Sequence, residues 1–287
     1  MRRRTVSFRC VRREDVAAVP PFLADVARVR RAASDKLWYR GHARLAYRLT
    51  PSIGRPHRYA GVELKFDEAR EWDLLHRFRR RAVPLMDCIP GEWEALFLAR
   101  HHGLPVRLLD WTASPLVALY FACASHLDDG GRVWALRRRP ATDELDVLAL
   151  AEGGPADGPF RVTRRLAGGV AGPARGRVVK IVHPFHNSPR LVAQEGAFTL
   201  HAPPWTPLEE LAGLPCRASA MDVGELVEWT VPPENKPGLL RELNALGITE
   251  RTLYPDLDGL ARSLWQTEVL WGAVAAPGAK PPRRRRA

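Results

Sequence analysis

An arginine followed by a glycine, Arg40-Gly41, is the first candidate for binding chemistry along this chain. It ends the aromatic run KLWYRG at 36–41, in which alternate residues would face opposite sides of a strand. A guanidinium can clamp a phosphate or fix a ribose, and a glycine lets the backbone approach a neighbour or a ligand closely. The run alone favours a plainer interpretation, in which Arg40 pairs with an acidic residue at the edge of the core.

A second group of polar residues lies in the block from 101 to 126. Asp110 follows the apolar run at 106–109, which has the character of a short buried strand. Thr112 and Ser114 then open a second, apolar helix. Turns beside a buried strand are common places for binding groups, so these polar side chains are candidates for a site.

Neither the histidines nor the cysteines have the spacing of metal ligands. His101 and His102 are adjacent, and neighbours on a helix point about 100° apart, so they do not easily share one metal. One of them is expected to be structural and the other to reach the turn at Asp110. The four cysteines lie far apart without a CxxC pair, and Cys123 occupies an apolar helical position as an inert thiol. We therefore predict no metal and no disulfide framework.

The motifs of several enzyme classes are absent. The chain has no Walker loop, no GxGxxG, no GxSxG and no HExxH. ATPases, dinucleotide oxidoreductases, serine hydrolases and zinc proteases therefore lack their usual marks.

The 287 residues carry a formal charge of +12, and much of it lies at the two ends. The basic residues at 2–4, 280 and 283–286 account for +8 and leave +4 for the rest. Such ends suit polyanions, but disordered termini at 1–13 and 271–287 are the simpler interpretation. No apolar run is long enough to span a membrane, and the charged N-terminus lacks the apolar region of a signal peptide. We expect a cytoplasmic protein with no membrane partner.

The hydrophobic pattern favours an α+β fold. Short strands are expected at 36–41, 106–109, 131–136, 178–182, 197–201 and 226–231. A long amphipathic helix is expected at 62–82, and the stretch at 137–176, rich in Gly, Pro and Arg, is expected to be an insertion. Helices grouped mainly before residue 126 and after residue 236 argue against a regular βαβ alternation.

Six segments together resemble the FRG domain, a family named for a Phe-Arg-Gly motif. They are WYRGH at 38–42, YRLTPSIGR at 47–55, HGLPVRLLDWT at 102–112, SPLVALYFA at 114–122, RLVAQEGAFTLH at 190–201 and LGITERTLYPDLDGLA at 246–261. The naming motif has Tyr39 in place of Phe, Val106 replaces a frequent Thr, and Ser114 replaces a frequent Asn. The resemblance implies one FRG domain over 14–270.

The FRG domain in turn resembles the ADP-ribosyltransferase superfamily. This resemblance implies a mixed or antiparallel β core with helices before and after it, and NAD as the substrate without a metal. It also implies a bacterial toxin or phage-defence setting, in which an antitoxin or another regulatory partner is expected.

Three motifs of this chain match the places that the superfamily uses for its site. The residues expected to bind the dinucleotide are Tyr39, Arg40, Gly41, His102, Asp110, Thr112 and Ser114. The Gly41 backbone would take the nicotinamide amide, and Arg40 would hold phosphate or ribose. The residues expected to act in catalysis are Arg40, Gln194 and Glu195.

The identity of the catalytic residue in the third motif stays open. A carboxylate opposes the positive charge of an oxocarbenium-like transition state better than an amide does, yet the recurring family residue matches Gln194, and Glu195 is the variable one. Adjacent strand residues face opposite sides, so one of the two is expected in the site. Either this is a transferase with an unusual third residue, or Glu195 supplies the charge, or the domain binds a nucleotide without cleaving it.

Two functions follow as expectations. The first is an NAD-dependent mono-ADP-ribosyltransferase that acts on a macromolecule, with DNA or RNA as the expected acceptor because of the basic segments. The second is a non-catalytic module that binds a nucleotide or nucleic acid in the same cleft.

Overall fold

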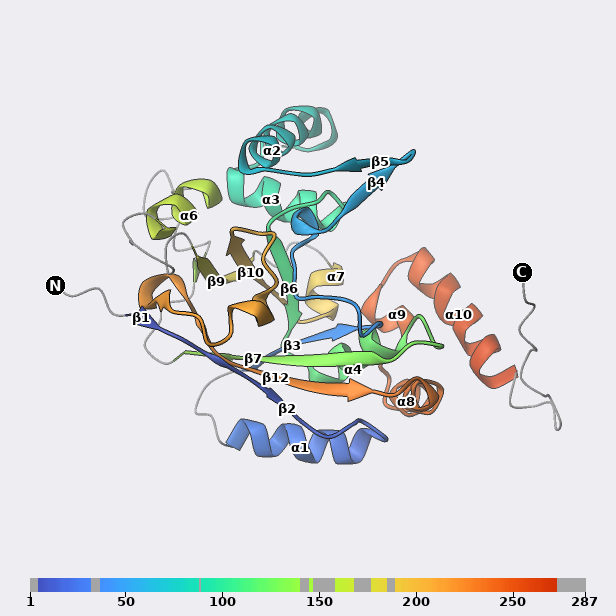
Figure 1. Ribbon diagram of the computed structural model, residues 1–287. Coiled ribbons are helices and arrows are strands. Elements are labelled where there is room, and N and C mark those ends of the chain that lie inside the picture. Colours follow the sequence, from blue (N-terminus) through green and yellow to red (C-terminus); the bar gives the residue numbers. More distant parts are fainter. Residues whose placement is uncertain are drawn as a thin grey trace.

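The computed structural model of the protein describes residues 5–31, 37–87, 89–139, 145–146, 158–167, 177–184 and 189–272. Its centre is a mixed, mostly antiparallel sheet with the strand order β2-β12-β7-β3-β6-β10-β9-β8 (Figure 1). The strands are β2 (Arg9–Arg12), β12 (Val223–Val231), β7 (Gly131–Arg138), β3 (Leu37–His42), β6 (Leu108–Thr112), β10 (Gly196–Ala202), β9 (Val178–His183) and β8 (Leu145–Asp146). The pairs β2–β12 and β8–β9 are parallel. The expected α+β class is therefore confirmed.

The sheet has a seam in its middle, between β3 and β6. These two strands pair at one position, Tyr39 opposite Thr112. On either side of the seam the ladders are longer, with six residue pairs between β3 and β7 and five between β6 and β10. The seam divides the sheet into two half-sheets, β2-β12-β7-β3 and β6-β10-β9-β8.

Each half-sheet has its own covering helices. The helices are α1 (Val19–Arg31), α2 (Glu68–Ala82), α3 (Glu92–His101), α4 (Pro115–Cys123), α6 (Pro159–Ala167), α7 (Pro189–Ala193), α8 (Lys236–Ala245), α9 (Glu250–Leu253) and α10 (Leu257–Gly272). Side chains of α1, α4 and α8 form one hydrophobic cluster with β3, β7 and β12. Side chains of α2, α3 and α6 form another with β6, β9 and β10. A third cluster includes residues of both half-sheets and so crosses the seam.

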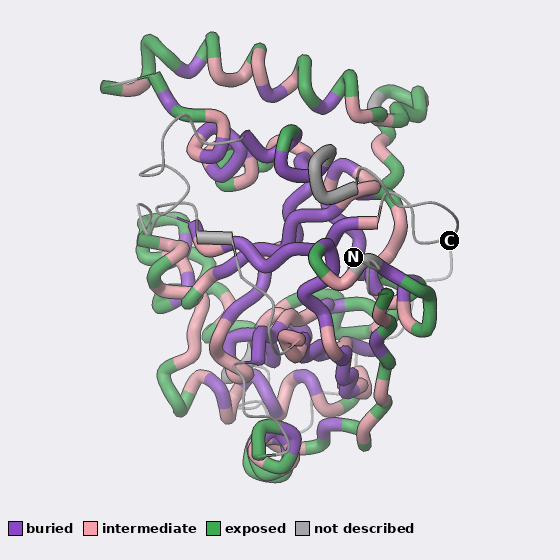
Figure 2. Tube along the Cα trace, turned by 90° about the vertical axis from the view of Figure 1, so that its left-hand side faces the viewer, coloured by how far each residue is buried: buried purple, intermediate pink, exposed green. Residues whose placement is uncertain are grey.

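Burial follows this layering. Buried residues gather along the centre of the molecule, and exposed residues follow the outer sides of the helices at its top and bottom (Figure 2). Along β3, Leu37 and Tyr39 pack in the cluster with α1, α4 and α8, whereas Trp38 packs in the cluster that crosses the seam. The expected alternation of this strand is therefore confirmed, and it places Arg40 on the same face as Trp38.

The expectation of disorder at 1–13 is wrong for residues 5–12. β1 (Thr5–Val6) pairs with β11 (Cys216–Arg217), and β2 adds a parallel strand to the edge of the sheet at β12. The physical reason lies in the partner strand, because Arg9 and Arg12 of β2 form ion pairs with Glu225 and Glu228 of β12. The first four residues lie outside the described part.

The helix expected at 62–82 begins later, at Glu68. The preceding residues form the hairpin of β4 (His57–Tyr59) and β5 (Val62–Leu64). Its turn residues Ala60 and Gly61 have positive φ angles of 48° and 80°, as a two-residue hairpin turn of the primed type requires. Asp67 then starts the helix, because its side chain accepts a hydrogen bond from the Arg70 backbone N–H at 2.8 Å.

Two further expectations fall partly outside the described residues. The insertion at 137–176 contains the end of β7, β8 and α6 where it is described. Of the tail expected at 271–287, residues 271–272 belong to α10 and the rest lies outside the described part. Among the described residues, no helix combines the length and the apolar composition needed to cross a bilayer.

Candidate functional site

A cavity of about 1120 Å³ opens at the seam between the two half-sheets. This volume is slightly above the range of about 300–1,000 Å³ that is usual for small-molecule sites. Most residues expected to form the site line this cavity, namely Tyr39, Arg40, Gly41, His102, Asp110, Thr112 and Gln194. Ser114 and Glu195 do not line it.

Three motifs that lie far apart in the sequence meet on one line across the sheet. Thr112 of β6 pairs with Tyr39 of β3 on one side and with Gly196 of β10 on the other. The Ala113 backbone N–H extends this contact by donating to the Glu195 carbonyl at 3.0 Å. Strand pairing therefore brings the first, second and third motifs of the sequence to the same wall of the cavity.

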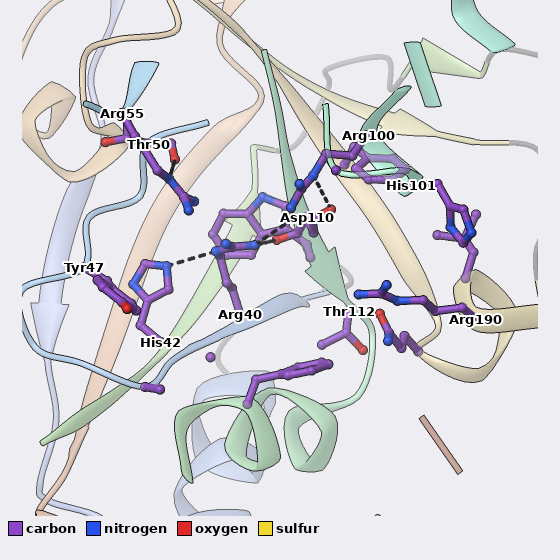
Figure 3. A pocket seen from close by; sticks show the side chains of 18 of the residues that line it. Arg40, His42, Tyr47, Thr50, Arg55, Arg100, His101, Asp110, Thr112 and Arg190 are labelled. Atoms are coloured by element: carbon purple, nitrogen blue, oxygen red, sulfur yellow. Dashed lines mark hydrogen bonds and ion pairs between the residues drawn. The ribbon is translucent and has the colours of Figure 1, made fainter. Parts of the chain in front are cut away.

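Arg40 lies where the ladder between β3 and β6 has ended. Its Nη1 donates to the main-chain carbonyl of Asp110 at 2.6 Å and lies 3.3 Å from Oδ2 of the same residue. Arg100, from α3, donates to both carboxylate oxygens of Asp110, with 3.0 Å between Nε and Oδ1. Figure 3 shows this Arg40–Asp110–Arg100 cluster in the middle of the pocket. The plainer interpretation of Arg40, as the partner of an acidic residue, is therefore confirmed.

The cluster keeps its charges in an enclosed place. Burial opposes ionisation of Asp110, but Arg100 and Arg40 outweigh it and hold the pKa of the carboxyl well below its usual range. Burial lowers the pKa of Arg40 to about 10, although Asp110 acts to raise it. All three groups therefore stay charged at neutral pH, and the Asp110 side chain still has 39% of its surface open to the cavity.

Two buried histidines lie close to Arg40 and are neutral. Nε of Arg40 donates to Nε2 of His42 at 3.0 Å, so this nitrogen carries no proton. Burial, and then Arg40, hold the pKa of His42 well below its usual range. Burial and Arg40 also lower the pKa of His201 to about 3, and its Nε2 lies 2.8 Å from Oγ1 of Thr199.

Gly41 lines the cavity and also packs closely against a helix. A Cβ atom at this position would lie 1.9 Å from the Ala118 carbonyl oxygen and 2.7 Å from the Ala122 nitrogen, both in the backbone of α4. The glycine therefore lets α4 pack directly on β3. Of the two expected uses of this glycine, close approach to a neighbouring element is confirmed, and contact of its backbone with nicotinamide stays a prediction.

Ser114 and His102 also have structural explanations. Ser114 is the N-cap of α4, and its Oγ accepts a hydrogen bond from the Val117 N–H at 3.4 Å. His102 ends α3, and its ring contacts His101 edge-on at 5.0 Å between centroids. Neither histidine reaches Asp110, whose carboxylate is bound by arginines instead.

Gln194 and Glu195 form a turn between α7 and β10 rather than part of a strand. Gln194 lines the cavity, and its Nε2 donates to the Leu253 carbonyl at 3.1 Å, which ties it to the end of α9. Glu195 has an exposed side chain and a positive φ of 46°. The geometry therefore places the amide, and not the carboxylate, in the cavity.

Several residues of the site were not among the sequence candidates. They are His42, Arg55, Arg100, Arg190 and Tyr254. Arg100 lies in the last turn of α3, where a basic residue is expected anyway because of the helix dipole. Arg55 and Arg190 lie in two of the motifs that carry the FRG resemblance, and that was the available signal.

The lining of the cavity is cationic. Its arginines are Arg40, Arg48, Arg55, Arg100 and Arg190, and its single acidic residue among the described ones is Asp110. Aromatic rings also line the cavity, including those of Tyr47 and Trp205, which are 43% and 49% exposed. An anionic ligand with planar rings fits both features.

The FRG domain family model matches residues 35–130. This FRG match covers about a third of the 287 residues, and it runs from just before β3 to just before β7. It therefore includes the Arg40–Asp110–Arg100 cluster and Arg55, whereas Arg190 and Gln194 lie beyond it. No curated protein and no solved structure matches the chain.

Proposed function

We propose that the cavity binds NAD and that the protein transfers the ADP-ribose group of NAD to a macromolecule. The observation that carries the proposal is the convergence of Arg40, Thr112 and Gln194 on one cavity at the seam. The cationic lining suits the diphosphate of a dinucleotide, because guanidinium groups bind phosphate through paired hydrogen bonds. The aromatic lining suits its two planar rings.

The reaction breaks the bond between the nicotinamide nitrogen and C1′ of the ribose. Nicotinamide leaves as a neutral molecule with the bonding electron pair, a lone pair of the acceptor forms the new bond to C1′, and the acceptor loses its proton to solvent. Positive charge develops at the sugar in the transition state. The oxygen of the Gln194 amide, which has no hydrogen-bond partner among the described residues, can accept from a ribose hydroxyl and align the sugar. A neutral amide opposes the charge only through its dipole, so we expect a slow enzyme.

DNA or RNA, rather than a protein side chain, is the proposed acceptor, because basic segments in a chain with a formal charge of +12 attract phosphate backbones. Single strands should react better than duplex, because a paired base cannot reach C1′ without leaving its stack. Such an activity fits a bacterial toxin or phage-defence effector that a partner protein holds in check.

Labelled NAD tests the acceptor. The protein is incubated with it and with single-stranded DNA, RNA or a protein lysate, at low and at moderate salt. We expect label on a nucleic acid, more at low salt. Label on protein alone would overturn the nucleic-acid acceptor and leave the transferase, whereas no label on any acceptor would count against transfer itself.

One observation favours a second candidate, a module that binds a nucleotide without cleaving it. The acid that lines the cavity, Asp110, is held by two arginines, and Glu195 lies outside the cavity. The described lining therefore contains no carboxylate that is free to stabilise a cationic sugar. Calorimetry that shows NAD binding, together with an NAD pool that stays intact, would favour this module over the transferase.

A further inference from the structure

The five arginines of the cavity fall into two groups according to their partners. Arg40 and Arg100 pair with Asp110, and Arg48 pairs with Glu209 and Glu210 at 2.5 and 2.8 Å. The other two, Arg55 and Arg190, form no ion pair with any described carboxylate. A cation without an acidic partner in a recessed place is a candidate for binding an anion from outside the protein.

Arg55 is held through Nε, and its two terminal nitrogens form no hydrogen bond with any residue that the structure describes. Its Nε donates to the Thr50 carbonyl at 2.9 Å, and this bond fixes the plane of the guanidinium (Figure 3). The loop that carries it is closely packed, because a Cβ at Gly54 would lie 2.2 Å from the Pro204 carbonyl oxygen. Burial and then Arg100 lower the pKa of Arg55, and Asp110 offsets them only in part. The negative charge of a bound anion would offset them further.

Arg190 is fixed in another way. Its guanidinium lies over the ring of Tyr254, 4.4 Å from the centroid, and its Nη2 lies 3.3 Å from the Tyr254 hydroxyl. It precedes Gln194 by four residues, and the Gln194 backbone N–H donates to its carbonyl at 3.0 Å, which is one helical turn. Arg190 is therefore a neighbour of the amide that we assign to the ribose.

The two arginines lie on different sides of the Arg40–Asp110–Arg100 cluster in the view of Figure 3. They also come from different elements, since Arg55 lies in the loop between β3 and β4, and Arg190 lies in α7, just before β10. Because of this separation, Arg55 and Arg190 need not bind the same diphosphate. We propose that the cavity contains two anion subsites, one at Arg55 for the diphosphate of the dinucleotide and one at Arg190 for a phosphate of the nucleic-acid acceptor.

The role of Gln194 at the ribose rests on the proposed function. The binding of anions at Arg55 and Arg190 does not depend on it. A phosphate held at Arg190 would bring a neighbouring base of a single strand towards C1′. Arg40 and Arg100 are then positioning residues, because their hydrogen bonds are directed to Asp110 and to His42 rather than into the cavity.

Paired variants separate the two subsites. Arg55→Gln and Arg190→Gln each remove one charge, and Arg44→Gln is the matched control, because Arg44 pairs with Asp129 and does not line the cavity. Binding of ADP is measured by calorimetry, and binding of a fluorescent single-stranded DNA 10-mer by anisotropy, at one salt concentration. Thermal melting checks that each variant is folded. Where a glutamine variant does not fold, Arg55→Lys or Arg190→Lys replaces it, because lysine keeps the charge but loses the paired hydrogen bonds of the guanidinium.

We expect Arg55→Gln to weaken ADP binding about tenfold or more and Arg190→Gln to weaken DNA binding by a similar factor, with little effect of either variant on the other ligand. Arg44→Gln should change the affinity for ADP less than Arg55→Gln does, and the affinity for DNA less than Arg190→Gln does. Three results would each overturn the two subsites. In the first, the parent protein binds neither ligand. In the second, both variants bind both ligands like the parent. In the third, Arg55→Gln and Arg190→Gln lose ADP binding equally. If Arg55→Gln loses only ADP binding and Arg190→Gln loses only DNA binding, but NAD stays intact, the transferase is refuted and the two subsites stand.

Discussion

Arg40 takes the place of a missing strand pair, because its guanidinium donates to the main-chain carbonyl of Asp110 at 2.6 Å just beyond the last paired residues of β3 and β6. A continued antiparallel register would have set Gly41 opposite Asp110. The side chain thus holds the two half-sheets together while leaving a gap between their backbones. The cavity opens at this seam and Arg40 lines it, so the same arginine supports the fold and forms part of the site.

Replacing Arg40 by lysine should destabilise the protein and weaken NAD binding together. An ammonium cannot reach the Asp110 carbonyl and His42 at once, as the guanidinium does through Nη1 and Nε. We expect a loss of about 1–3 kcal/mol in the free energy of unfolding, measured with urea. Calorimetric titration of the variant with NAD reports the binding. Unchanged stability and unchanged affinity would remove Arg40 from both roles.

A methyl group at Gly41 should be far more damaging than one at a glycine with open space. The Cβ of Gly41→Ala would meet the backbone of α4 at 1.9 Å, and backbone cannot move away as a flexible side chain can. We expect a loss of at least about 3 kcal/mol or an insoluble protein. Gly238→Ala is the control, since nothing lies within 4 Å of its Cβ and it is part of α8, and it should stabilise by about 0.5–1 kcal/mol. Equal effects of the two substitutions in urea unfolding would contradict this explanation.

Gln194 and Glu195 should differ sharply as catalytic candidates. Gln194→Ala removes the cavity amide, and we expect kcat for nicotinamide release to fall about tenfold to a hundredfold while KM for NAD changes little. Glu195→Gln changes an exposed side chain outside the cavity and should keep the parent rate. A steep loss of rate in Glu195→Gln would return the catalytic role to the carboxylate.

Acidification should destabilise the fold through the buried histidines. The pKa of His201 is lowered to about 3 by burial and by Arg40, whereas an unfolded histidine titrates near 6.5. The unfolded chain therefore binds more protons, so the contribution of His201 is fully present above about pH 6.5 and is lost as the pH falls towards 3. His201→Gln should reduce the slope of unfolding free energy against pH between about 6.5 and 5, by at most ~1.4 kcal/mol per pH unit. Parallel curves for parent and variant would contradict this assignment.

The sequence predicted those parts of the fold that depend on local pattern. The alternation of Leu37, Trp38 and Tyr39 in β3 and the N-cap at Ser114 follow from neighbouring residues, and both are observed. The strand β2 was missed because its sequence RCVR is stabilised by ion pairs with Glu225 and Glu228, which lie more than two hundred residues away.

The site was predictable where the family resemblance named a residue, and less so where geometry decides its role. Nothing local distinguishes Arg100, which binds Asp110, from a basic residue that only complements a helix end. The role of Gly41 depends on the close approach of α4, which is a tertiary contact. Likewise, the turn that sends Gln194 into the cavity and Glu195 outside it depends on a positive φ that residue types alone do not reveal.

The most direct test of the central proposal is the release of nicotinamide from NAD by the purified protein. NAD is incubated with the parent and with Gln194→Ala, with and without single-stranded DNA, and free nicotinamide is measured by chromatography over time. We predict that nicotinamide accumulates in proportion to the parent protein, faster with DNA, and far more slowly with Gln194→Ala. NAD that stays intact with the parent protein, with and without DNA, would contradict the transferase.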